Sequence, residues 1–152
     1  MSKELDFKQA VAATIDIKSG YQAGLKALGQ DSNKIKLGKT SACGGSVDID
    51  ASVKALYPKS NRWDYCFAYK GEVFFVEVHS AITSEVSTVI KKLQWLKDWL
   101  TEKAPQLKIK QATTRTPFYW IQSSNFNIPI TSRQYRTVVQ AGIKPIAFLE
   151  LK

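Results

Sequence analysis

The fold is decided by residues 62–79, whose sequence is RWDYCFAYKGEVFFVEVH. Two runs rich in aromatic and β-branched residues, 62–69 and 72–81, are separated only by Lys70 and Gly71. A two-residue connection that ends in glycine is typical of a β-hairpin. The segment therefore predicts two antiparallel strands joined by a tight turn.

The turn also fixes which residues of the two strands face each other. Counting outward from it places Asp64 opposite Glu77 and Arg62 opposite His79. Because side chains alternate between the faces of a sheet, Asp64, Glu77 and His79 project from one face. The other face is expected to belong to the core, since it carries Tyr65, Phe67, Tyr69, Phe74, Val76 and Val78.

Two carboxylates that face each other across a hairpin repel, because directly opposed Cβ atoms lie about 4.5–5.5 Å apart. A proton shared by Asp64 and Glu77, an ion pair with Arg62, or a bound cation could offset the repulsion. A hard divalent ion, Mg²⁺ or Mn²⁺, fits carboxylate oxygens best. Alternatively, one carboxylate reaches solvent or pairs with Arg62 or Lys92, and no metal binds.

The whole chain, residues 1–152, is predicted to form one α/β domain. The order of elements is helix, three strands, helix, strand, helix, strand, which favours a single mixed β-sheet flanked by helices. The helices are expected at 3–28, with a possible break into two helices at Gly20 and Gly24, and at 84–103 and 131–141. The strands are expected at 46–57, 62–69, 72–81, 108–121 and 145–151.

The chain is basic, with a formal net charge of +9. Residues 103–149 contain seven lysines or arginines and no acidic residue. Basic residues interleaved with aromatic ones suit a polyanion whose bases can stack, so DNA or RNA is a candidate partner. An ordinary aromatic core in a basic protein explains the same composition. The aromatic residues of this stretch are Phe118, Tyr119, Trp120, Phe126 and Tyr135.

Several classes of protein are disfavoured. No apolar run approaches the roughly 18 residues needed to cross a bilayer, and residues 1–13 lack the features of a signal peptide. We therefore expect a cytoplasmic protein without a membrane partner. Cys43 and Cys66 have no neighbour at metal-ligand spacing, and the chain has one histidine. Free thiols are expected, and a zinc site is disfavoured.

Asp64, a hairpin and Glu77-Val78-His79 followed by a helix resemble the PD-(D/E)xK, or restriction-endonuclease-like, nuclease superfamily. The resemblance covers residues 3–121 and implies an αβββαβ core, here followed by a C-terminal helix and strand. It implies that Asp64, Glu77 and the carbonyl of Val78 bind Mg²⁺ or Mn²⁺. It also implies that the substrate is a phosphodiester.

The sequence departs from this family at two positions. Trp63 stands where a proline would precede Asp64, a position that varies widely in the family. His79 stands at the position of the family's lysine; histidine can orient or deprotonate water but cannot supply a constant positive charge. In such sites the lysine can instead come from the following helix, which makes Lys92 a catalytic candidate beside His79. The alternative for Lys92 is a solvated position at the flank of the helix.

Other acidic residues are weaker candidates. Glu4 shares a helix face with Phe7 and could match an acid found in the first helix of many members, or complement the helix dipole. Asp48 and Asp50 form an acidic pair on one face of the strand expected at 46–57. They would join the site only if that strand lies on the proper side of the hairpin, and are otherwise a solvent-facing surface.

The remaining expectations concern partners. Trp95 and Trp99 lie off the buried stripe of the helix at 84–103, and they could form a homodimer contact or pack against the N-terminal helix. Cationic side chains are expected to hold the nucleic-acid substrate, namely Arg62, Arg115, Arg133 and Arg136.

Three functions compete at this point. The first is a metal-dependent endonuclease or exonuclease, with His79 and Lys92 in catalytic roles. The second is a catalytically degenerate module of the same fold that binds nucleic acid or a protein partner, which the missing lysine favours. The third is an interaction domain, for example an accessory, inhibitor or immunity-type protein that binds an acidic partner.

Overall fold

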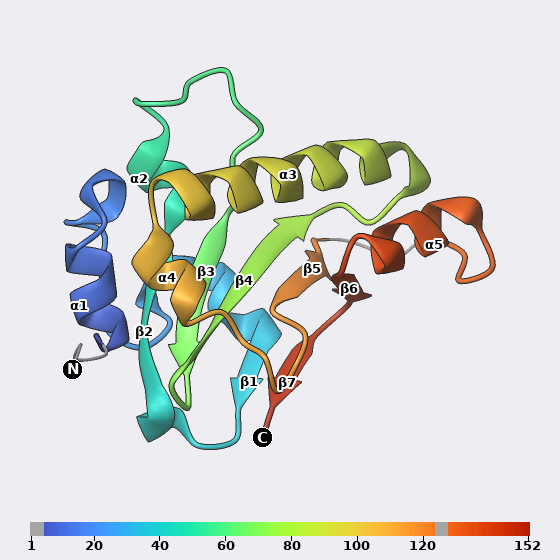
Figure 1. Cartoon of the computed structure of the whole chain (residues 1–152). Helices are drawn as coiled ribbons and strands as arrows, with labels where there is room; N and C mark the ends of the chain where they lie inside the picture. The colour runs from blue at the N-terminus through green and yellow to red at the C-terminus, as the bar shows by residue number, and fades with distance from the viewer. Residues whose placement is uncertain (1–4, 124–127) are drawn as a thin grey trace.

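The computed structural model describes residues 5–123 and 128–152. Its centre is a five-stranded mixed sheet in the order β2-β3-β4-β5-β6 (Figure 1). Neighbours from β2 to β4 are antiparallel, and those from β4 to β6 are parallel. The prediction of an α/β domain with a mixed sheet flanked by helices is confirmed. The strands are β2 (Cys43–Asp48), β3 (Tyr65–Tyr69), β4 (Glu72–His79), β5 (Phe118–Gln122) and β6 (Ile143–Ile146).

Helices cover one face of this sheet, and a second, two-stranded sheet covers the other. The helical face packs on the side chains of Cys66, Phe75 and Trp120, and the opposite face on Phe67 and Phe74. The helices of the first face are α1 (Phe7–Ala12), α3 (Val86–Glu102), α4 (Pro105–Ile109) and α5 (Arg133–Gln140). The second face is covered by the 3-10 segment η2 (Lys26–Lys34) and the parallel pair β1 (Ile35–Leu37) and β7 (Leu149–Leu151).

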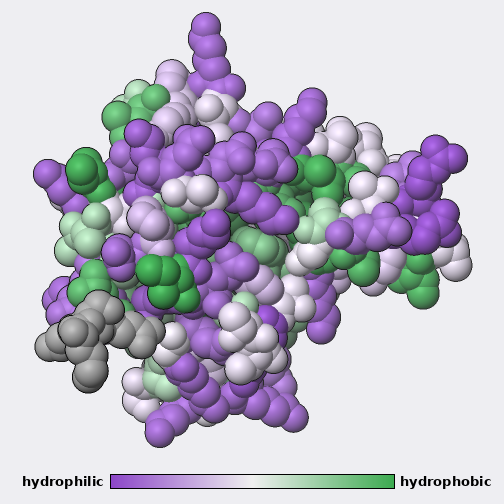
Figure 2. All heavy atoms as spheres, viewed as in Figure 1, coloured by the Kyte–Doolittle hydropathy of each residue, from purple (hydrophilic) through white to green (hydrophobic). Residues whose placement is uncertain are grey.

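Short elements connect these layers. They are η1 (Ile15–Ile17), η3 (Thr40–Ala42), α2 (Ile49–Val53) and η4 (Thr83–Glu85). Figure 2 shows that hydrophilic residues dominate the face of the molecule that carries α3. In the described part of the chain, no helix is long and apolar enough to cross a membrane.

The hairpin has the predicted register. Tyr69 pairs with Glu72, and the ladder continues to Tyr65 opposite Val76. At the turn, Lys70 (φ 50°) and Gly71 (φ 80°) both adopt left-handed backbone conformations, as the tight hairpin turn that matches the strand twist requires. This turn therefore sets the alignment of every residue farther along both strands.

We expect the substitution Gly71→Ala to destabilise the protein by about 1 kcal/mol. An added Cβ atom would meet nothing within 4 Å, so the cost comes from the left-handed backbone alone. Urea unfolding measures the loss, with Lys59→Ala in an exposed loop as the control. If both variants unfold at the same urea concentration as the unsubstituted protein, the turn does not need glycine.

Two expected elements are wrong in the N-terminal half. In place of the helix expected at 3–28, with its possible break at Gly20 and Gly24, the described residues form α1, η1 and the start of η2. The strand expected at 46–57 ends at Asp48, because the Asp48 carboxylate accepts a hydrogen bond from the backbone N–H of Ala51 (2.9 Å) and caps α2. Asp48 and Asp50 therefore do not share a strand face.

Two expected strands also differ in the C-terminal half. The end of α4 takes the place of the first part of the strand expected at 108–121. This helix begins at Pro105, because the N–H of a first helical residue has no partner within the helix and proline lacks that N–H. The strand expected at 145–151 is divided between β6 and β7, which belong to different sheets. The short strand β1 has no counterpart among the predicted elements.

The aromatic residues of the basic stretch are core residues rather than a stacking surface. Phe118, Tyr119 and Trp120 are buried, and Tyr135 is partly buried against the core. Phe126 lies outside the described residues. The expectation that these rings stack on bases is therefore wrong for β5, and the ordinary core is correct.

The two tryptophans of α3 contact the N-terminal part of the chain. The prediction that Trp99 lies off the buried stripe is wrong, because Trp99 is buried and its Nε1 donates to the carboxylate of Asp16 in η1 at 3.0 Å. Trp95 stacks on Trp99 and meets the edge of Tyr57. Packing within the chain therefore explains Trp99, and a homodimer remains a prediction.

Candidate functional site

The hairpin and α3 bring three charged side chains together. Asp64 immediately precedes β3, Glu77 lies near the end of β4, and Lys92 lies on the inner flank of α3. Backbone contacts hold Asp64 in place, since its carbonyl accepts a hydrogen bond from the N–H of Ile49 (2.8 Å). Asp64 and Glu77 thus meet just beyond the last residue pair of the hairpin, on the face covered by α3.

Backbone hydrogen bonds connect each carboxylate to the segment that carries the other. The N–H of Asp64 donates to Oε1 of Glu77 (3.1 Å), and the N–H of Val78 donates to Oδ2 of Asp64 (3.0 Å). Each carboxylate keeps one further oxygen, and both of these oxygens contact Lys92. Its Nζ lies 3.7 Å from Oδ1 of Asp64 and donates to Oε2 of Glu77. The prediction that Asp64 and Glu77 share one face is confirmed.

Burial changes the protonation behaviour of all three groups. Glu77 is fully buried; this burial and the charge of Asp64 raise its pKa to about 8, although Lys92 opposes the rise. Burial also raises the pKa of Asp64. Burial alone would lower the pKa of Lys92, but the charges of Glu77 and Asp64 raise it on balance. The ammonium group therefore stays charged beside the two acids.

His79 lies beside this trio and has a partner that sequence reasoning missed. Its Nδ1 is 3.6 Å from Oε2 of Glu77, and its Nε2 is 3.1 Å from Oε2 of Glu85. Glu85 ends η4, the turn between β4 and α3. Its only signal in the sequence is its position at the start of the predicted helix. Trp120 Nε1 donates to the His79 carbonyl (3.1 Å) and holds the end of β4.

Of the four arginines expected to contact substrate, Arg62 does not face His79. Its Nε pairs with Asp50 (2.7 Å) and its Nη1 donates to the carbonyl of Tyr57 (2.7 Å). Lys92, and not Arg62, is therefore the cation that offsets the repulsion between the acids.

In the described part of the chain, the other three arginines form no ion pair with Asp64 or Glu77. Arg115 donates to the carbonyl of Lys152 (2.9 Å), beside the two-stranded sheet. Arg133 and Arg136 are exposed on α5, which contacts α3 (Figure 1). Glu4 lies outside the described residues. The substrate-binding roles of these arginines stay predictions.

The donor set suits a hard divalent ion. Asp64 and Glu77 offer carboxylate oxygens and Val78 a carbonyl, and proteins commonly hold Mg²⁺ with one or two carboxylates, water and substrate phosphate. Among the described residues, no group of three or more histidine, cysteine or acidic side chains is arranged to hold a metal. An ion that used the two outer oxygens would have to displace the Lys92 ammonium group, because the ammonium contacts both of them.

Comparison of the chain with models of protein families, with curated proteins and with solved structures gave no match. The arrangement of Asp64, Glu77 and Lys92 is therefore the basis for a functional assignment. Its carboxylate oxygens would be open to a cation only after the ammonium group has moved, and the ammonium group could contact an anion that approaches the acids.

Proposed function

We propose that this protein is a divalent-metal-dependent phosphodiesterase that acts on DNA or RNA. The observation that supports it most strongly is that Lys92 contacts both Asp64 and Glu77 at the end of the hairpin. A PD-(D/E)xK site combines two acids with one lysine. Lys92 would supply from α3 the positive charge that His79 cannot supply from β4.

Each residue has a role in this proposal. Asp64, Glu77 and the carbonyl of Val78 would hold Mg²⁺ or Mn²⁺, whose charge favours water ionisation and stabilises a phosphate that gains charge. Lys92, released from the acids, would contact a phosphate oxygen. His79, oriented by Glu85, would accept a proton from water.

One observation favours a second candidate, a catalytically degenerate module of the nuclease fold that binds nucleic acid or a protein partner. The Glu77 side chain is fully buried, and Lys92 already contacts it without a metal. Such a module would bind nucleic acid with a steep dependence on salt, or bind a protein, and would cleave no substrate in Mg²⁺ or Mn²⁺.

Calorimetric titration of Mn²⁺ tests the site without knowledge of the substrate. We expect the unsubstituted protein to bind Mn²⁺ and Glu77→Gln to bind it roughly a hundredfold more weakly, because a charged oxygen ligand is lost. Asp98→Asn, which removes an exposed acid of α3, is the matched control and should bind Mn²⁺ normally. Equal affinities of all three proteins would contradict a metal site at Glu77.

A further inference from the structure

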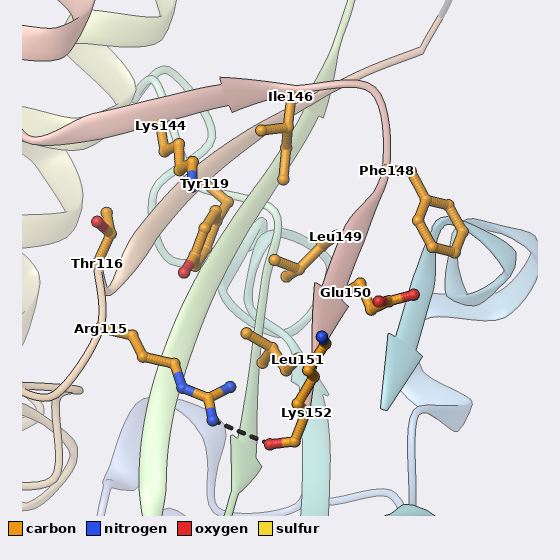
Figure 3. Close-up of a pocket in the computed structure, with 10 residues that line it drawn as sticks. All are labelled: Arg115, Thr116, Tyr119, Lys144, Ile146, Phe148, Leu149, Glu150, Leu151 and Lys152. Atoms are coloured by element: carbon orange, nitrogen blue, oxygen red, sulfur yellow. Dashed lines mark hydrogen bonds between the residues drawn. The ribbon is translucent and has the colours of Figure 1, made fainter. Parts of the chain in front are cut away.

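A second polar site lies on the face of the sheet opposite Asp64 and Glu77. It is a surface hollow of about 680 Å³ between the segment that leads into β5 and the strand β7 (Figure 3). This volume is typical of pockets that bind small molecules. Its hydrogen-bond donors come from segments far apart in the sequence, and they are Arg115, Thr116, Tyr119, Lys144 and Lys152.

The donors line the same hollow. Figure 3 shows the Tyr119 side chain pointing into the hollow, with Lys144 on one side of it and Arg115 on the other. The Nη2 of Arg115 donates to the carbonyl of Lys152 (2.9 Å), which fixes the guanidinium group. A guanidinium group has five N–H donors, so this bond leaves most of them for other acceptors.

Tyr119 remains a donor at neutral pH. Its side chain is largely buried, and this burial raises the pKa of the phenol, against the opposing effect of Arg115. A neutral phenol donates its O–H to an anion, whereas a phenolate would repel it. The hollow thus combines a neutral hydroxyl donor with fixed positive charge.

Positive charge exceeds negative charge in the lining. The only acid among the lining residues is Glu150, and Figure 3 shows its carboxylate directed away from Arg115 and Tyr119. A nearby acid, Glu72, accepts hydrogen bonds from the backbone N–H groups of Thr113 and Thr114. Neither acid fills the space between the donors.

The rim of the hollow also carries an exposed aromatic ring. Phe148, in the connection between β6 and β7, is 49% exposed. Figure 3 shows this ring across β7 from Arg115 and Tyr119, so it lies at the far rim of the hollow. Aromatic side chains along a positively charged groove bind bases in proteins that hold single strands. The buried aromatic residues of β5 cannot provide this contact.

We propose that this hollow binds a phosphate ester, carried by a nucleotide or by a single strand of nucleic acid. Arg115, Lys144 and the hydroxyl of Tyr119 contact the phosphate, and Phe148 contacts the base. The hollow shares no residue with the carboxylate site, so this inference goes beyond the proposed function and stands independently of cleavage.

Binding of a fluorescent oligothymidylate, measured in EDTA, tests the proposal. We expect Lys144→Gln to weaken binding roughly fivefold and to reduce the slope of log affinity against log salt by about one. Lys59→Gln removes the same charge from an exposed loop elsewhere and should leave both values unchanged. Phe148→Ala should weaken binding about tenfold through loss of stacking.

A competition experiment separates the two sources of the phosphate. If thymidine monophosphate displaces the oligothymidylate, the site accepts a free nucleotide; if only oligomers compete, it holds a strand. The proposal would be overturned if Lys144→Gln and Lys59→Gln lost equal affinity for the oligothymidylate, or if neither probe bound at millimolar concentration. Lys144 is exposed, so its variant keeps the fold, and circular dichroism verifies this. Because no metal is present, failure of Mn²⁺ binding at Glu77 leaves this result unaffected.

Discussion

Replacement of Asp64 by asparagine or of Glu77 by glutamine should lower Mn²⁺-dependent cleavage of nucleic acid by roughly a thousandfold, because each change removes a charged ligand of the ion that stabilises the reacting phosphate. Both substitutions preserve the size of the side chain. Asparagine at position 64 can still accept the hydrogen bond from the N–H of Val78. The fold should therefore survive, and the loss should be in the rate.

Cleavage is best measured on a mixed pool of single-stranded and double-stranded DNA and RNA, since the substrate is part of the question. Asp98→Asn is the matched control, because it removes an exposed acid from α3 and should cleave at the original rate. Undiminished cleavage by both Asp64→Asn and Glu77→Gln would locate the activity elsewhere. Mn²⁺ binding without cleavage of any substrate would favour the catalytically degenerate module.

The substitution Lys92→Met should destabilise the protein by about 3–5 kcal/mol at about pH 9.5 and by much less at pH 5. Above the pKa of Glu77, the loss of the ammonium group leaves Asp64 and Glu77 without their counter-charge in a buried position, or forces Glu77 to keep its proton. At pH 5 Glu77 is protonated, because burial and Asp64 raise its pKa to about 8. A neutral carboxyl group needs no counter-charge.

The sign of the pH effect in the unsubstituted protein follows from the same pKa. The folded protein binds a proton at Glu77 more tightly than the unfolded chain does, where the pKa is near its usual value. The stability that this group contributes is therefore complete below about pH 4.3 and is lost as the pH rises through about 8. Urea unfolding at pH 5, 6.5 and 8 measures this decline.

Two further proteins make the test specific. Lys91→Met removes the neighbouring charge from the exposed side of α3 and should have little effect at either pH. The double variant Lys92→Met/Glu77→Gln removes the ammonium group together with the buried acid and should recover much of the stability lost at about pH 9.5. If Lys92→Met is destabilised equally at pH 5 and pH 9.5, the ion pair is not the cause.

The positions of Asp64, Glu77 and Lys92 could be predicted because they depend on patterns between residues close in the sequence. A two-residue turn set Asp64 beside Glu77, because strand alternation propagates a register without help from the rest of the chain. Lys92 was found as a candidate because the apolar stripe of α3 fixes which side of the helix it occupies. Both inferences needed only residues within one hairpin or one helix.

The rest of the site depends on contacts that local sequence patterns do not predict. Ile49 and Val53 alternate with polar residues as in a strand, yet their spacing of four also fits one face of a helix, and capping by Asp48 selects the helix. That helix carries Asp50, which pairs with Arg62. The contact of Glu85 with His79 likewise depends on the path of η4, which has no periodic signal.

The parallel pairing of β1 with β7 has a consequence for synthesis of the chain. β1 gains its partner only after β7 has been translated, which is long after the hairpin of β3 and β4 has left the ribosome. Until then the hairpin surface that carries Phe67 and Phe74 lacks part of its cover. A nascent chain with such an uncovered apolar surface is a target for chaperones and for aggregation, so the rate of translation through the C-terminal third governs how long this exposure lasts.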